Sequence, residues 1–443
     1  MRLALLLLAV LPSILFAQAG SPAGPVPVDR LQARRAALLD RIGTGIAVLQ
    51  AAEERSADPP DSDYPQDSDF RQDSDVFYLT GLEEPGMWVV LVGRADGPDE
   101  VRLYLPRRNP QREQWMGPRL GPGPEAAALA GLPVTSLRAA DSAEAEIHAL
   151  VSAPDSPARA GALFLKQNRR TAASPFFQRL IGAGARLENL LPHLGAQRLV
   201  KDADEIRRLR RAAEISAAGH VAAIRAGAPG VWEYEVEAAA EGTFRRLGAE
   251  RLGYPSIVGA GVNGTVLHYD KSRSQLAEGD LVVMDMGAEF GYYTADISRT
   301  FPASGRFTPR QRAIYDLVLG AQQAAMDSVR PGITMARLQQ IARQFMRDNS
   351  RDLCGQRTCD AYFIHGLGHW IGMEVHDVGG YGMPLQPGMV LTIEPGIYLA
   401  AEGLGVRIED DVLVTETGYE LLSHGVPRKA EDVERLMAEA RRR

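Results

Sequence analysis

Two aspartates, Asp285 and Asp296, lie in the segment LVVMDMGAEFGYYTADISRT over residues 281–300, which reads as two β-strands. A tight turn at Phe290-Gly291 would place Asp285 directly opposite Asp296, with both side chains on one face. Opposed carboxylates with apolar neighbours repel each other, and burying them without a partner costs several kcal/mol. Two interpretations stay open from this segment alone: a cation lies between the aspartates, or both point to solvent at the tip of a hairpin.

Three histidines follow within twelve residues, in the segment IHGLGHWIGMEVHD over residues 364–377. His365 and His369 have the spacing of a helical zinc pair, but the glycines between them argue against a helix. We therefore expect a loop or an irregular strand, in which at most one of the two need be a ligand. His376 is the third. An earlier histidine, His268, lies in the Gly/Asn-rich stretch GAGVNGTVLHYD, which suits a loop lining a pocket or an ordinary surface position.

Two glutamates lie in apolar stretches further along the chain. Glu394 occurs in MVLTIEPGIY, where the proline that follows keeps it out of the helical conformation. Glu409 occurs in VRIEDDVLVT, two residues after Arg407 and so on the same face of a strand. Taken singly, either glutamate could instead form a salt bridge with Arg407.

The acidic residues and one histidine make a consistent set of metal ligands when they are taken together: Asp285, Asp296, His369, Glu394 and Glu409. Four carboxylates nearly balance two divalent cations and a single bridging hydroxide. Oxygen-rich ligation with one imidazole suits Mn²⁺, with Co²⁺ or Zn²⁺ as possible substitutes. Two such ions, about 3.5–4 Å apart, could hold the hydroxide as a nucleophile at neutral pH.

The order and local motifs of these residues resemble the pita-bread metallopeptidases: the paired aspartates, HGLGHWIG, EPGIY and VRIEDD. In the first half of the chain, FRQDSDVFYLTGLEEP at 70–85 resembles the N-terminal domain of aminopeptidase P-type enzymes and their prolidase relatives. The resemblance implies an α/β N-terminal domain and an α+β pita-bread catalytic domain, with a curved antiparallel sheet covered by helices. Nearly the whole chain after its first residues is covered.

The resemblance also implies an activity. A dinuclear-metal exopeptidase of this family hydrolyses the Xaa-Pro bond at the N-terminus of a peptide by attack of the bridging hydroxide. A strict Xaa-Pro dipeptidase is the alternative. A methionine aminopeptidase would share the five ligands, but the large N-terminal domain with its own motif argues against it. A non-catalytic or metal-free relative would be expected to lack some of the ligands.

Residue roles follow from the same resemblance. Asp296 and Glu409 would touch both metals, and Glu394 would also shuttle the proton of the hydroxide. His376 would stabilise the oxyanion, while Arg407 would orient carboxylates. The catalytic residues expected in this way are His268, His365, His376, Glu394 and Arg407, with His268 and His365 on the substrate side.

A chain of 443 residues is long enough for two domains to position these side chains. Helical spacing over 28–42 and buried strands at 46–49, 88–92 and 101–105 indicate an α/β first half. The stretch LPHLG at 191–195 breaks that pattern, and Asp202 with Glu205 forms a capping box that begins a long helix containing His220, expected to be a packing or exposed residue. We expect an N-terminal domain at 28–195, a linker at 196–203 and a catalytic domain at 204–443.

The first residues read as an export signal. An apolar run at 3–16 precedes Ala17-Gln18-Ala19, so we expect a signal peptide at 1–19, a flexible lead-in at 20–27, and a periplasmic or secreted protein. An uncleaved anchor is the alternative. The net charge of −7 excludes a basic nucleic-acid footprint, and no membrane association is expected after cleavage. The expected partners are proline-containing peptides and, from the family resemblance, further copies in a homodimer or homotetramer.

Two smaller patterns remain open. Cys354 and Cys359 could form a disulfide after export, but a single pair is weak evidence for a metal site. Asp-Ser-Asp occurs three times, at 61–63, 67–69 and 73–75. Calcium binding and a solvated loop are both conceivable, and the solvated loop is favoured because the spacing does not match a twelve-residue calcium loop.

Overall fold

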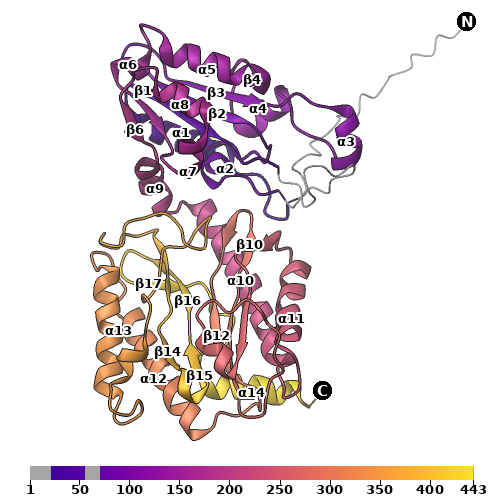
Figure 1. Ribbon diagram of the computed structural model, residues 1–443, viewed down its shortest axis with the longest axis vertical. Coiled ribbons are helices and arrows are strands. Elements are labelled where there is room, and N and C mark those ends of the chain that lie inside the picture. Colours follow the sequence, from indigo (N-terminus) through magenta and orange to yellow (C-terminus); the bar gives the residue numbers. More distant parts are fainter. Residues whose placement is uncertain (1–20, 55–69, 443) are drawn as a thin grey trace, which may run out of the picture. The chain divides into compact units, whose positions relative to one another are not determined.

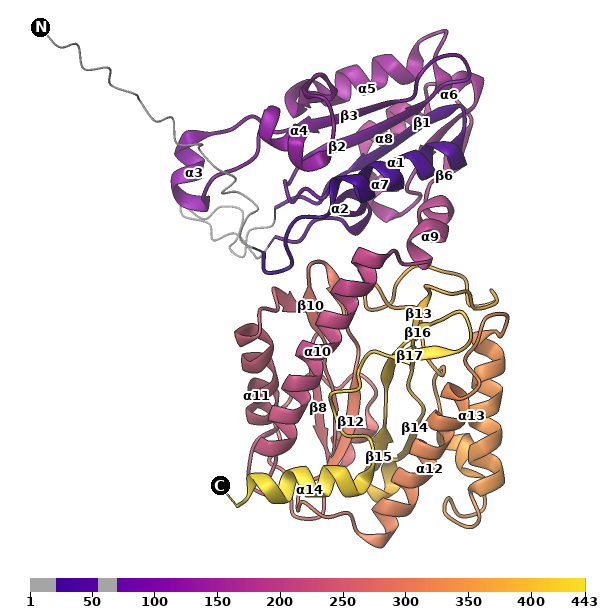
Figure 2. The same cartoon turned by 180° about the vertical axis from the view of Figure 1, so that it is seen from behind.

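The computed structural model describes residues 21–54 and 70–442, and the chain divides into two compact units, 1–193 and 194–443 (Figures 1 and 2). The predicted signal peptide and the first two Asp-Ser-Asp copies lie outside the described residues. In the part that is described, no helix combines the length and the apolar character needed to cross a membrane.

The first unit is built on a six-stranded mixed sheet in the order β4-β3-β2-β1-β5-β6. Its strands are β1 (Gly45–Gln50), β2 (Trp88–Gly93), β3 (Glu100–Leu105), β4 (Leu137–Ala139), β5 (Ala162–Leu165) and β6 (Leu187–Asn189). Its helices are α1 (Val28–Ile42), α2 (Ser74–Thr80), α3 (Pro110–Met116), α4 (Pro124–Ala130), α5 (Ala143–Ser152), α6 (Pro157–Ala160), α7 (Arg169–Ala173) and α8 (Pro175–Ile181). The helix predicted at 28–42 and the three predicted strands are confirmed.

Alternate residues of β1 and β2 face opposite helical layers. Ile46, Val48 and Val90 belong to a core that also contains residues of α5 and α8. Helix α1 packs against the sheet through β2. This is the α/β arrangement that interleaved strands and helices indicate.

The third Asp-Ser-Asp copy has a structural role in this unit. Asp73 caps α2 by accepting hydrogen bonds from the backbone N–H groups of Asp75 and Val76. Lys166 Nζ lies 2.8 Å from Asp73 Oδ2 and 2.6 Å from Asp75 Oδ2. A lysine therefore supplies the positive charge that a calcium ion would have brought to this copy.

The junction between the units differs from the prediction. Residues 191–195 do not break the chain but begin helix α9 (Leu191–Leu199), since Pro192 is tolerated in the first turn of a helix. The predicted linker at 196–203 is therefore largely helical, and only residues 200–202 separate α9 from α10 (Ala203–Ala226). The capping box of Asp202 and Glu205 at the start of α10 is confirmed.

The second unit is an α+β structure in which every strand pair among the described residues is antiparallel. Its strands are β7 (Arg251–Leu252), β8 (Ile257–Ala260), β9 (Leu281–Asp285), β10 (Ala288–Phe290), β11 (Tyr293–Thr294), β12 (Ser298–Pro302), β13 (Val390–Ile393), β14 (Gly396–Leu399), β15 (Leu404–Arg407), β16 (Asp410–Val414) and β17 (Tyr419–Leu421). Besides α10, its longer helices are α11 (Glu233–Arg246), α12 (Pro309–Met326), α13 (Met335–Asn349) and α14 (Ala430–Ala440). Figure 1 shows α10 and α11 on one side of the strands and α12 and α13 on the other.

The aspartate hairpin has a different register from the one predicted. Its turn lies at Gly291-Tyr292, both with positive φ (58° and 71°), and not at Phe290-Gly291. Asp285 consequently pairs with Ser298 instead of Asp296. The predicted register is wrong by two positions, but an even shift leaves each side chain on its face. The conformation of Tyr292, unfavourable for a non-glycine residue, accompanies a ring that is almost completely buried.

The second unit also contains the two cysteines and the buried histidine His220. Cys354 and Cys359 form a disulfide that closes a short loop just before the segment carrying His365. His220 is fully buried on α10, with Nε2 2.9 Å from the carbonyl oxygen of Met286, so it is a packing residue as predicted.

Candidate metal centre

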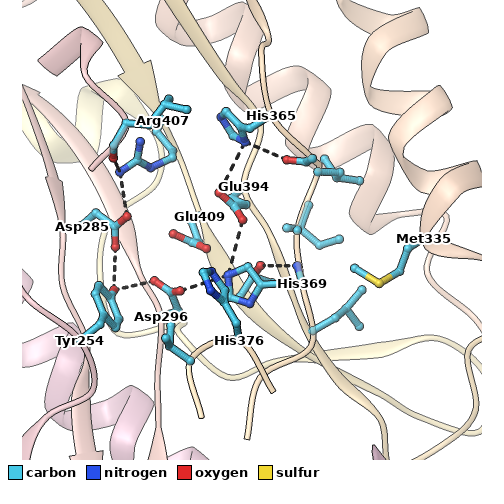
Figure 3. A pocket seen from close by; sticks show the side chains of 18 of the residues that line it. Tyr254, Asp285, Asp296, Met335, His365, His369, His376, Glu394, Arg407 and Glu409 are labelled. Atoms are coloured by element: carbon cyan, nitrogen blue, oxygen red, sulfur yellow. Dashed lines mark hydrogen bonds and ion pairs between the residues drawn. The ribbon is translucent and has the colours of Figure 1, made fainter. Parts of the chain in front are cut away.

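Strand ends and one irregular segment bring the predicted ligands to one cavity of about 820 Å³ in the second unit (Figure 3). Asp285 is the last residue of β9, Glu394 directly follows β13, and Glu409 lies between β15 and β16. His369 comes from a segment without helix, as the glycines predict. All nine predicted site residues line this cavity: His268, Asp285, Asp296, His365, His369, His376, Glu394, Arg407 and Glu409.

The imidazole of His369 lies at the centre of the acidic residues. Its Nε2 is 3.3 Å from Asp296 Oδ2 and 3.6 Å from Glu394 Oε1. Asp296, His369 and Glu409 each offer a ligand atom, and these atoms all lie within 4.8 Å of one another. His369 Nδ1 is 3.2 Å from the carbonyl oxygen of Trp370, a contact that directs the hydrogen to Nδ1 and the Nε2 lone pair toward the carboxylates. Metal-binding histidines commonly have this outer partner.

If all four carboxylates were ionised, their negative charge would exceed what the described side chains neutralise. Arg407 Nη2 lies 2.7 Å from Asp285 Oδ2; burial acts to raise the pKa of Asp285, but this cation holds it below its usual value. Burial, together with the neighbouring carboxylates, raises the pKa of Asp296 and of Glu409 well above the usual range. Burial likewise raises the pKa of Glu394 to about 7. A bound cation would favour the ionised forms of all four.

Two groups in the site have incomplete hydrogen bonding that a metal ion would complete: the Glu409 carboxylate and the pair of aspartates beside Tyr254. Glu409 Oε2 accepts a hydrogen bond of 2.7 Å from Ser298, but the buried Oε1 has no partner among the described residues. The hydroxyl oxygen of Tyr254 lies 2.6 Å from Asp285 Oδ1 and 2.5 Å from Asp296 Oδ1. One hydroxyl hydrogen cannot serve both acceptors. The donor set, the excess charge and the unpartnered oxygen all fit divalent cations.

Arg407 also fixes the orientation of His365 through Tyr398. Arg407 Nη1 donates to the Tyr398 hydroxyl at 3.1 Å, and that hydroxyl lies 2.9 Å from His365 Nε2. The hydroxyl can then donate to Nε2, which leaves the hydrogen on Nδ1, 2.8 Å from the carbonyl oxygen of Gly366. Burial lowers the pKa of His365 to about 4, so the ring is neutral at pH 7.

The two remaining histidines lie toward solvent. His376 is exposed, and its ring stands perpendicular to that of His369 with 4.3 Å between the centroids. Burial and the neighbouring His369 lower the pKa of His376. The sequence left open whether His268 lines a pocket or lies on the surface. In the structure it lines the cavity and is exposed, so both descriptions apply.

Two tyrosines of the site were not predicted from the sequence. Tyr398 lies in the EPGIY motif on β14, and because it follows Glu394 by four residues, strand alternation would have placed both side chains on the same face. Tyr254 precedes β8 and carries no local signal, because only the folded chain brings it between two aspartates more than thirty residues away.

Comparisons with known proteins cover both units. Residues 207–416 match the model of metallopeptidase family M24, and residues 31–156 match the aminopeptidase P N-terminal domain. The Xaa-Pro aminopeptidase of Escherichia coli K12 is 35% identical over 94% of this chain and 98% of its own length. The low-pH structure of E. coli aminopeptidase P superposes with a TM-score of 0.87 at 32% identity, covering 95% of this chain and all of that one. A zinc-substituted form of that enzyme, in complex with product, has a TM-score of 0.84 with the same identity and coverage.

Proposed function

This chain belongs to metallopeptidase family M24, and from that premise we propose that it is an Xaa-Pro aminopeptidase, a hydrolase that removes the N-terminal residue of a peptide whose second residue is proline. The observation that carries the proposal is the group of four carboxylates and His369 that line one cavity, because in their ionised form these carboxylates carry more negative charge than the surrounding side chains balance. The extent of the match to the E. coli enzyme, which includes the N-terminal domain, supports an aminopeptidase over a dipeptidase.

Two divalent cations held by Asp285, Asp296, His369, Glu394 and Glu409 would activate a water molecule and polarise the scissile carbonyl. Mn²⁺ is the ion that we propose, because the donor set is rich in oxygen. Zn²⁺ and Co²⁺ are substitutes that the same donors accept.

The side chains around these ligands would orient the substrate and move the proton. Glu394 lies between His369 and His365, with Oε2 3.7 Å from His365 Nδ1, where it can take a proton from water and pass it to the leaving proline nitrogen. His376, exposed beside His369, would stabilise charge on the carbonyl oxygen. Arg407 holds Asp285 and Tyr398 and does not need to touch the substrate.

The cleaved bond suits a metal-dependent site. An Xaa-Pro bond has no N–H, and proline fixes φ near −65°, so proteases that bind their substrate as an extended strand lose a hydrogen bond there. A site that acts on the carbonyl group does not depend on that hydrogen bond.

The decisive experiment compares Ala-Pro-Ala with Ala-Pro in the presence of saturating Mn²⁺. We expect release of alanine from the tripeptide, loss of this activity with a chelator, and its return with Mn²⁺. Turnover of the dipeptide alone would identify a strict dipeptidase. A folded protein that binds no divalent metal and cleaves neither peptide would refute the enzyme proposal.

Matched variants locate the activity. Asp285→Asn and His369→Ala should each lower kcat by at least about 100-fold while the circular dichroism spectrum is retained, because each removes one ligand atom. Lys166→Met, in the first unit, serves as the control. Wild-type activity in either ligand variant would contradict the assignment.

We also propose that the protein is exported. The apolar run at 3–16 with its Ala-x-Ala sequence supports this, and so does the disulfide, because such bonds persist in oxidising compartments. Cell fractionation and sequencing of the mature N-terminus test it; a cytosolic protein that begins at Met1 would contradict it.

A homodimer or homotetramer is the assembly that we propose from the family resemblance. Light scattering of the purified protein at micromolar concentration gives its mass directly. A mass equal to that of a single chain would contradict the proposal.

A further inference from the structure

A buried group of three charged side chains is formed around the residue that follows His376 in the sequence. The next residue, Asp377, has a side chain that is only 1% exposed, and its carboxylate contacts two cations. Arg198 Nη2 lies 2.6 Å from Oδ1, and Lys201 Nζ lies 3.1 Å from Oδ2. Burial acts to raise the pKa of Asp377, but the two cations hold it below its usual value, so the carboxylate is charged.

Such a group is costly to bury. Each ion loses its hydration, so a well-packed apolar cluster would serve stability at least as well. A buried ion pair of defined geometry can instead fix where the chain lies. Arg198 lies in the last turn of α9, and Lys201 lies in the short stretch between α9 and α10, so both cations come from the beginning of the second unit.

The loop between His369 and Asp377 folds back onto this group. The Asp377 N–H donates to the carbonyl oxygen of Trp370 at 2.9 Å. Gly372 is required where the loop passes the carboxylate, because a Cβ there would lie 2.1 Å from Asp377 Oδ2. The same glycine accepts a hydrogen bond at its carbonyl from the N–H of Thr294, two residues before Asp296. The loop is thus held between the junction stretch and the aspartate hairpin.

The His376 side chain makes few contacts that could fix its orientation. Its side chain is exposed, and within residues 21–54 and 70–442 its imidazole contacts the ring of His369 but has no hydrogen-bond partner. The position of its Cα is therefore set chiefly by the adjacent, immobilised Asp377.

We propose that Asp377 is a positioning residue for His376, and that Arg198 and Lys201 hold the Asp377 carboxylate so that the His376 ring stands over the cavity beside His369. The proposal rests on the proposed function. It predicts that loosening Asp377 lowers turnover only because His376 moves, whereas a purely structural role would lower stability and leave the contribution of His376 intact.

A double-mutant cycle tests this on the full chain with Ala-Pro-Ala and Mn²⁺. Asp377→Asn keeps the shape of the side chain and removes its charge. We expect it to lower kcat about tenfold or more, since small displacements of a catalytic group have large effects, with a smaller change in KM. In a His376→Ala background the same substitution should lower kcat less than about twofold, because the group that it positions is already missing.

Asp204→Asn is the matched control. Asp204 also lies between two cations, with Oδ1 2.7 Å from Arg207 and Oδ2 2.8 Å from Arg208, but on α10 and away from the loop of His376. It should lower the melting temperature without a kcat effect that depends on His376. Bound metal should equal the wild-type value in all of these variants.

A second readout does not use activity. In the metal-free protein labelled with ¹⁵N-histidine, the His376 ring signal should shift or broaden in Asp377→Asn and stay unchanged in Asp204→Asn. If Asp377→Asn does not fold, the cycle and the spectrum are repeated with Lys201→Met, which keeps the contact of Asp377 with Arg198 and should give a smaller effect of the same kind.

Equal losses in both backgrounds, wild-type kcat in Asp377→Asn, or an unchanged His376 signal would each overturn the proposal. An inactive wild-type enzyme would instead refute the proposed function, and the spectrum of His376 would still report on the positioning.

Discussion

At the scale of single residues, Tyr254 shows what the metal-free site must do. Its hydroxyl oxygen contacts a carboxylate oxygen of Asp285 and one of Asp296, but the hydroxyl has a single hydrogen. One of these two oxygen–oxygen contacts therefore needs a second proton, on a carboxyl group, or a nearby cation. The opposite pKa shifts of the two aspartates agree with this: Asp285, paired with Arg407, stays ionised, whereas burial and the charge of Asp285 favour a protonated Asp296. Burial and the charge of Asp296 raise the pKa of Glu409 in the same way.

Metal binding should therefore release protons. Because burial and the neighbouring carboxylates raise the pKa of Asp296 and of Glu409, a cation that favours their ionised forms displaces protons when it binds. We expect calorimetric titration with Mn²⁺ at pH 7, in buffers of different ionisation enthalpy, to show release of at least one proton per chain. Glu409→Gln should release fewer. A heat that is independent of the buffer would contradict the prediction.

At the scale of elements, α10 and the aspartate hairpin meet at His220. The Nε2 of this buried histidine donates to the carbonyl oxygen of Met286, next to Asp285, and its Nδ1 has no partner among the described residues. A proton on Nδ1 would thus be buried without an acceptor, and burial lowers the pKa of His220 from 6.5 to about 4.

This pKa makes the stability of the second unit depend on pH. Below pH 6.5 the unfolded chain binds a proton at His220 that the folded chain refuses until about pH 4, so the folded state loses stability as the pH falls through this range. The contribution is about 3 kcal/mol when complete. His220→Gln keeps a donor for Met286 and should flatten the pH dependence of the unfolding free energy between pH 6.5 and 4. An unchanged slope would contradict the prediction.

The loop that carries His268 is held by one buried carboxylate. Glu233 Oε1 accepts from the N–H of Ala260 at 2.8 Å and from Asn263 at 2.9 Å, and Oε2 accepts from Tyr269 at 3.0 Å and from the N–H of Ser274 at 2.9 Å. All four partners are donors, so the carboxylate is fully used.

Replacing this carboxylate should loosen the loop. In Glu233→Gln one oxygen becomes an NH₂ group that faces two donors, which leaves them without an acceptor and costs about 1–3 kcal/mol. We expect a lower melting temperature and a severalfold higher KM for Ala-Pro-Ala, with a smaller change in kcat. Wild-type KM in a destabilised variant would show that the loop does not contact the substrate.

At the scale of the whole molecule, much of the site could be predicted from the charge pattern. Carboxylates in apolar stretches, with a histidine among glycines, predict a shared cation before any contact is known, and all nine residues line one cavity. The register of the hairpin could not be predicted, because the turn that forms at Gly291-Tyr292 depends on burial of the Tyr292 ring by the rest of the fold. Tyr254 and the pairing of Asp377 with Arg198 depend on contacts over distant parts of the chain, for which the sequence has no local signal.

The positions of Arg198 and Lys201 limit where the N-terminal domain could be exchanged for that of another protein. Both precede residue 204, where the sequence suggested that the catalytic domain begins, yet both neutralise a carboxylate inside that domain. A catalytic domain transferred to a foreign N-terminal domain with a crossover at 204 would inherit a buried anion without its counterions, whereas a crossover at 194 would carry them along. Of two such chimaeras, only the one joined at 194 should be recovered as soluble, cooperatively folding protein. Recombination between relatives would then tolerate exchange of the N-terminal domain only upstream of α9's last turn.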